Sequence, residues 1–123
     1  MTISTTIQKD IRTLIVTEVA DVAVYDRFAL VNDANPYITF GPMQTVQNHA
    51  KGSRFRIYNT TLHLFFRDST GSIAGRNLAD EVLEALDMKR LTESERDCYF
   101  VDMIPIYEED EAMNHIVMNF EVR

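Results

Sequence analysis

The stretch RFRIYNTTLHLFF, residues 54–66, alternates in a pattern that predicts one long β-strand with apolar side chains on both of its faces. The two alternating sets are Tyr58, Leu62, Leu64 and Phe66 on one face, and Phe55, Ile57, His63 and Phe65 on the other. Such a strand must be covered on both sides to keep its apolar groups from water. Other segments of the chain, or a partner, must therefore cover each face.

A second strand precedes this one and contains a break. Residues 37–40 are predicted to be extended, and Gly41-Pro42 then interrupts the pattern as a bulge or bend would. Pairing is expected to resume from Met43 to Asn48, and His49 to Ser53 is expected to form the tip of a hairpin. A link this short favours an antiparallel pair.

Two helices are predicted. Thr5 and Gln8 have the spacing of a capping box, and apolar residues then recur at helical intervals over Thr6 to Thr17. After a break at residues 68–72, the second helix places one apolar stripe on one face. The members of that stripe are Ala74, Leu78, Val82, Ala85 and Leu86.

The remaining pieces complete an α+β architecture. Strands are predicted at Val22 to Tyr25, Tyr99 to Ile106 and His115 to Val122, with a loop at residues 29–35 and a polar link from Lys89 to Glu95. The expected order is α-β-β-β-α-β-β. We predict a single domain over residues 1–123, with a mostly antiparallel sheet of four to five strands and two helices packed on one face.

Two helices cover only one face of such a sheet, so apolar residues on the other face are candidates for an interface. Self-association is therefore expected. The apolar interface candidates are Ile57, Phe65 and Val117, and the cationic ones, in or beside the hairpin, are Lys51, Arg54 and Arg56. A cationic hairpin suits an acidic neighbouring subunit.

Residues that could support catalysis or bind a metal do not form a recognisable pattern. The sequence lacks a serine elbow and the glycine motifs that bind phosphates or dinucleotides. His49, His63 and His115 have no metal-ligand spacing, although His63 could pair with His115 across neighbouring strands. Cys98 is interpreted as a small core residue of a strand. No catalytic residue, metal or cofactor is expected.

The chain has 123 residues and a formal net charge of −7, which disfavours tight binding to nucleic acid. It contains no apolar run of about eighteen residues and no secretory signal. We therefore expect no contact with a membrane, and we expect the protein to be made in a cytosol. The run Glu108, Glu109, Asp110 and Glu111 has three interpretations: a solvated turn, a site for a hard cation, or the lining of a channel that repels DNA phosphate.

Six segments follow one another in a characteristic order and spacing. They are the N-terminal helix, Val22-Ala23-Val24-Tyr25, Asn35-Pro36-Tyr37-Ile38-Thr39-Phe40-Gly41, Thr61-Leu62-His63-Leu64-Phe65-Phe66, the helix with Leu78-Ala79-Asp80-Glu81-Val82-Leu83-Glu84-Ala85-Leu86, and His115-Ile116-Val117-Met118-Asn119-Phe120. Over nearly the whole chain this order resembles the tail terminator, or tail completion, proteins of long-tailed bacteriophages.

That resemblance implies a non-enzymatic virion protein of the head-tail joining type, assembled in the host cytoplasm. It implies a hexameric ring at the head-proximal end of the tail. The partners of that ring would be the tail tube protein and the head connector. DNA would pass through the lumen without specific binding. Three alternatives stay open: a head-tail connector component, a small dimeric ligand-binding regulatory domain and, third, a hydrolytic enzyme.

Overall fold

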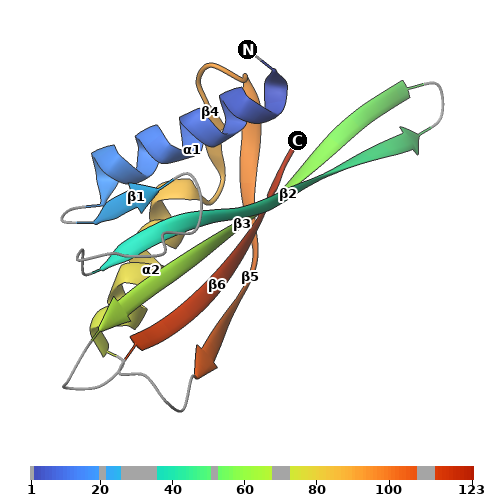
Figure 1. Ribbon diagram of the computed structural model, residues 1–123. Coiled ribbons are helices and arrows are strands. Elements are labelled where there is room, and N and C mark those ends of the chain that lie inside the picture. The colour runs from blue at the N-terminus through green and yellow to red at the C-terminus, as the bar shows by residue number, and fades with distance from the viewer. Residues whose placement is uncertain (1, 20–21, 26–35, 51–52, 68–72, 108–112) are drawn as a thin grey trace.

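The structure is a computed structural model that describes residues 2–19, 22–25, 36–50, 53–67, 73–107 and 113–123. The described residues form two helices, each followed along the chain by three strands (Figure 1). Their bounds are α1 Ile3–Glu18, β1 Ala23–Tyr25, β2 Tyr37–Ala50, β3 Ser53–Arg67, α2 Ile73–Leu86, β4 Lys89–Leu91, β5 Arg96–Tyr107 and β6 Met113–Val122. The predicted α+β class is confirmed.

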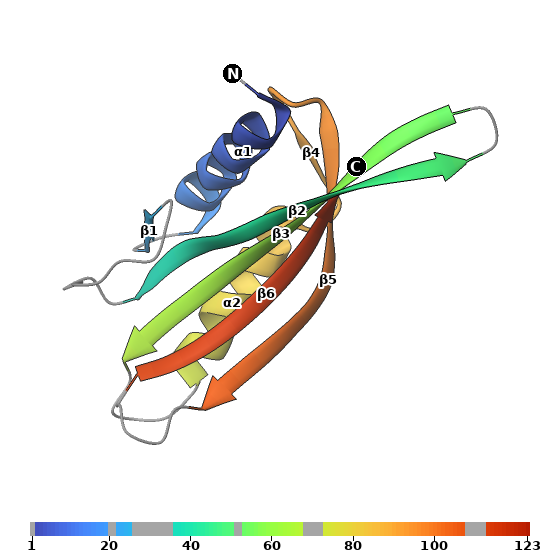
Figure 2. The same ribbon diagram turned by 45° about the vertical axis from the view of Figure 1, so that its right-hand side comes forward.

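All six strands belong to one sheet, in the order β1-β2-β3-β6-β5-β4. β1 runs parallel to β2, and every other strand pair in the described residues is antiparallel. The curved sheet carries α1 and α2 on the same side (Figure 2). We call the other side the open face.

The core lies between the helices and the sheet. Ile7, Ile11 and Ile15 of α1 are fully buried, as are Val82 and Leu86 of α2. They pack against every second residue of the central strands, which includes the predicted inward set of β3. The alternation of residues 54–66 thus orients β3 as expected.

Three local expectations need correction. α1 begins at Ile3, with Thr2 as its N-cap, because the Thr2 hydroxyl accepts a hydrogen bond from the backbone N of Thr5 at 3.3 Å. The proposed box at Thr5 and Gln8 is therefore not the start of the helix. The link predicted at Lys89 to Glu95 contains a strand, β4, which pairs with β5. The hairpin ladder continues to the pair Ala50 and Ser53, so its connection is shorter than predicted.

The strand count rises to six because β4 is too short to show an alternating pattern. Met88 and Glu95 flank this region with positive φ angles of 56°, a conformation that non-glycine residues rarely adopt. Leu91 is the one buried side chain of β4. Long-range pairing and a single apolar anchor, rather than local periodicity, define this strand.

The break at Gly41-Pro42 is a register shift between Phe40 and Met43, which confirms the predicted bulge. Beyond it, β2 and β3 outrun their neighbours, because β6 ends at Val122, opposite Tyr58. The part of this hairpin formed by residues 46–50 and 53–57 projects from the body as a two-stranded ribbon (Figures 1 and 2). We call it the arm.

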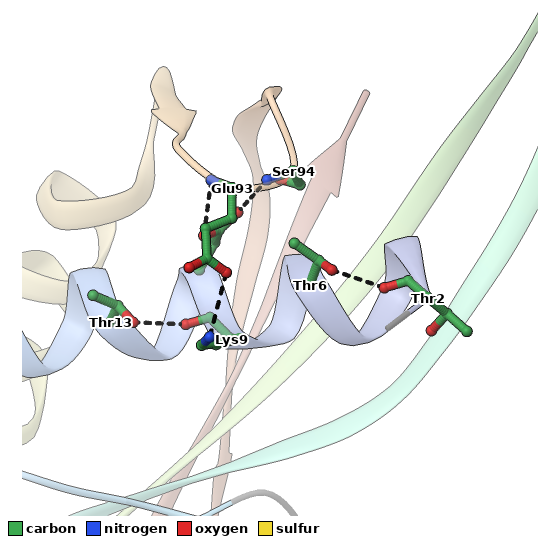
Figure 3. Close-up of polar contacts among 7 residues, drawn as sticks. Thr2, Thr6, Lys9, Thr13, Glu93 and Ser94 are labelled. Carbon is green, nitrogen blue, oxygen red and sulfur yellow. Dashed lines mark hydrogen bonds and ion pairs between the residues drawn. The ribbon is translucent and has the colours of Figure 1, made fainter.

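A buried carboxylate joins α1 to the turn between β4 and β5. Asp10 is only 7% exposed, and its carboxylate accepts hydrogen bonds from the backbone N of Glu93 at 3.2 Å and of Ser94 at 2.8 Å. Figure 3 shows the turn that carries Glu93 and Ser94 above α1. These bonds satisfy two backbone donors that would otherwise lack partners in the turn.

Replacing Asp10 with alanine is expected to lower the free energy of unfolding by about 1–2 kcal/mol, because both backbone donors lose a charged acceptor. Urea unfolding followed by circular dichroism measures the change. Lys9→Ala is the matched control, since the ion pair of Lys9 with Glu93, at 3.5 Å, joins side chains about half exposed. That pair should contribute well under about 1 kcal/mol. Equal losses in both variants would contradict the assignment.

Candidate assembly surface

An aromatic row crosses the end of the open face where β3 finishes. Backbone register places Tyr37 opposite Phe65, and Phe65 opposite His115. The ring centroids lie 4.9 Å apart for Tyr37 and Phe65 and 4.3 Å apart for Phe65 and His115, and both pairs are stacked. Stacking leaves Phe65 only 5% exposed, although it is outside the core cluster under the helices.

His63 and His115 lie beside this row and are joined by a hydrogen bond. His63 Nδ1 and His115 Nε2 are 2.8 Å apart, which establishes the pairing that the sequence left open. Gly41 makes room for the His63 ring, since a Cβ there would lie 2.8 Å from His63 Nε2. Partial burial lowers the pKa of both imidazoles, and the neighbouring His63 lowers that of His115 further.

Stability is expected to fall as the pH is lowered through the ordinary histidine pKa of 6.5, because the unfolded chain then binds protons that the folded imidazoles resist. Unfolding free energies of the wild type and of His63→Gln/His115→Gln, measured at about pH 7.5 and about pH 5.5, test this. The wild type should lose more stability than the variant. Carboxylate titration is common to both proteins and cancels. Equal losses would show that the pair does not contribute.

The outer half of β5 is the most exposed apolar strand segment in the described part of the chain. β4 covers the edge of β5 only from Arg96 to Cys98. Beyond that point Val101 is 54% exposed, Ile104 52% and Ile106 39%. Among the described residues no strand pairs with this edge, so its backbone groups face outward. We call residues 101–106 the β5 edge.

A polar band separates the β5 edge and the aromatic row from the arm. The Thr61 hydroxyl donates to Asn119 Oδ1 at 2.9 Å, and Asn119 Nδ2 donates to Asp102 Oδ1 at 2.6 Å. Asn59 Nδ2 donates to Gln44 Oε1 at 3.3 Å along the same face. The open face thus has two apolar areas instead of one continuous patch.

The arm carries the second apolar area. Val46 and Phe55 are each 39% exposed, and Ile57, which is opposite Val46, is half-buried. Arg56 is exposed on the other side of the ribbon. Its backbone oxygen accepts from the Arg96 guanidinium at 3.4 Å, so the inner edge of the arm is partly occupied by this subunit's own body.

The predicted interface residues do not form one site. Phe65 and Val117 lie near each other on the open face, whereas Ile57 belongs to the arm. Arg56 is on the arm as predicted, but Lys51, the side chain of Arg54 and the run Glu108, Glu109, Asp110 and Glu111 lie outside the described residues. Val46 and Ile104 are not among the interface residues named individually from the sequence. Pro105, a residue favoured in edge strands, was the signal available for β5.

Cys98 is buried in β5, as predicted. Its burial, and to a smaller extent the negative charge of the nearby Asp87, raises the pKa of its thiol to about 12. In the part of the chain that the structure describes, no three His, Cys, Asp or Glu side chains gather into a metal site. No described helix is long and apolar enough to cross a membrane.

The fold is that of a small α+β subunit, and exposed apolar areas such as the arm and the β5 edge usually mark protein interfaces. Residues 11–123 match the family model described as tail completion protein gp17, and the chain belongs to that family. It is therefore a structural protein of a viral tail, as the resemblance in sequence implied.

Among solved structures, a chain in the virion of a native gene transfer agent particle has the same fold, with a TM-score of 0.68 and 19% sequence identity. The match covers 98% of this chain and 90% of that one. No curated protein matches the sequence. At this identity the structural likeness supports the fold alone.

Proposed function

We propose that this tail completion protein closes into a ring on the head-proximal end of the tail tube, stops tube growth and presents a docking surface to the head connector. The carrying observation is the exposed apolar β5 edge, with Ile104 52% exposed, on a subunit of this family. An exposed apolar surface of that kind commonly marks a site where a protein partner binds. The proposed role needs no catalytic residue.

A ring requires each subunit to bind the next through two different surfaces. The arm and the β5 edge are two such surfaces, and a polar band keeps them apart on one subunit. A single self-complementary patch would instead favour a closed dimer, as the regulatory-domain alternative requires. Two separate apolar areas therefore support the ring over the dimer.

The overall charge fits a passage for DNA. At −7, the subunit has too little positive charge to hold phosphate groups tightly. A ring of such subunits would let DNA pass through its lumen without specific binding. We propose six subunits, by the resemblance to terminator rings, with the tail tube protein on one side and the head connector on the other.

Light scattering coupled to size exclusion tests the ring directly. The subunit has a mass of 14.2 kDa, and a particle of about six such masses is expected, alone or after mixing with tail tubes. Electron microscopy should then show a ring at one end of each tube. A strict dimer at all concentrations, with tubes left uncapped, would refute the proposal in favour of the regulatory domain.

A further inference from the structure

We infer that the arm of one subunit docks on the β5 edge of the next copy, so that this contact closes the ring. The inference rests on the proposed function, which requires a ring but does not say which surfaces meet. Its starting point is that both surfaces are exposed, apolar and extended. They also lie on different parts of the sheet, because β6 separates β2 and β3, which form the arm, from β5.

The first argument is apolar matching. Val46 and Phe55 of the arm and Ile104 and Ile106 of the β5 edge are among the most exposed large apolar side chains described. Val46 lies opposite Ile57, so that the arm presents apolar groups from both of its strands on one side. Packing the two areas together would remove both from water, and on one subunit the polar band separates them.

The second argument is the backbone. Beyond Cys98, the outer edge of β5 has no strand partner in the described residues. The outer edge of β2 pairs with β1 only as far as Thr39, so in the arm this edge also has no strand partner among the described residues. The edge of β3 is less open, because Arg96 already donates to the Arg56 oxygen. An unpaired edge accepts another strand by main-chain hydrogen bonds. We therefore assign the outer edge of β2 as the one that meets β5.

The third argument is charge, and it selects the arm over a second β5 edge. The hairpin sequence 43–57 contains three cationic residues and no acidic one, and Arg56 is exposed in the structure. The β5 edge carries Asp102. Two β5 edges side by side would bring like charges together, whereas an arm brings opposite ones.

Cysteine cross-linking tests this contact. Val46→Cys is combined in turn with Val101→Cys, Ile104→Cys and Ile106→Cys, because the register of the contact is open by a few residues. Under mild oxidation at least one double variant should form a ladder of covalent multimers, about tenfold more abundant than in either single variant. The buried Cys98, with its raised pKa, makes the wild type a suitable unreactive control.

Mixing two single variants, Val46→Cys and Ile104→Cys, supplies the matched control. A head-to-tail contact gives covalent dimers and nothing larger, since each copy then has one reactive surface. Homodimers of Ile104→Cys alone would overturn the inference, because they require β5 to meet β5. So would an intact ring in which all three double variants stay uncross-linked, and the proposed function would survive that result. Absence of any ring, with or without tail tubes, would reject both.

Discussion

Replacing Ile104 with aspartate is expected to leave a folded subunit that no longer forms a ring. Ile104 is 52% exposed, so its own subunit tolerates a charge there. In the assembly that carboxylate would be buried without a partner, at a cost of about 3–5 kcal/mol per contact. Association should weaken by a factor of about 10² to 4 × 10³. Light scattering should report a mass near the 14.2 kDa of the subunit.

Val16→Asp is the matched control for this variant. Val16 is 57% exposed, as much as Ile104, but it lies on the outer surface of α1, away from the open face. The ring should persist in Val16→Asp. A ring that persists in Ile104→Asp as well would exclude the β5 edge from the contact. Loss of the circular dichroism signal in Ile104→Asp would show instead that Ile104 stabilises the subunit.

Phe65 is a poorer choice for this experiment, although the sequence placed it on the same face. Its ring is stacked between Tyr37 and His115 and is 5% exposed. A charge at this position would break the aromatic row within the subunit before it affected a neighbour. We therefore propose that Phe65 contributes to an interface only indirectly, by supporting Tyr37 and His115 in the aromatic row.

Gly75→Ala is expected to destabilise the fold by about 2–4 kcal/mol, against the usual trend for helices. Alanine favours a helix over glycine by about 1 kcal/mol. A Cβ at residue 75, however, would lie 1.8 to 2.2 Å from three atoms of the Phe66 ring, so the ring would have to leave its place. Loss of a buried phenyl ring's packing costs about 3–5 kcal/mol. Urea unfolding measures the net effect.

The double variant Gly75→Ala/Phe66→Leu separates the clash from other effects of the substitution. Leucine at residue 66 is smaller, so the added methyl group should cost little in that background and the two changes should couple strongly. Additive losses would show that the clash is not the cause. The same contact explains why a glycine stands in the first turn of α2: the helix packs closely on Phe66 of β3 there.

Local patterns were sufficient for much of the fold. The alternation of residues 54–66 predicted β3 and its inward face, Gly41-Pro42 predicted the bulge in β2, and the apolar stripe ending at Leu86 predicted α2. These predictions succeeded because side-chain periods of two and of 3.6 residues are properties of the backbone itself. The α+β class followed from their order along the chain.

The candidate site depended on contacts that local patterns do not contain. Which strand lies at the edge, how far β2 and β3 outrun β6, and how Tyr37 and His115 bury Phe65 are consequences of pairings between residues far apart in sequence. Alternation tells which side of a strand is apolar, but not whether another strand or ring covers it. The sequence by itself determined that β3 is apolar on both faces. Only the tertiary structure decided that the exposed apolar groups gather on the arm and the β5 edge, because exposure is set by long-range packing.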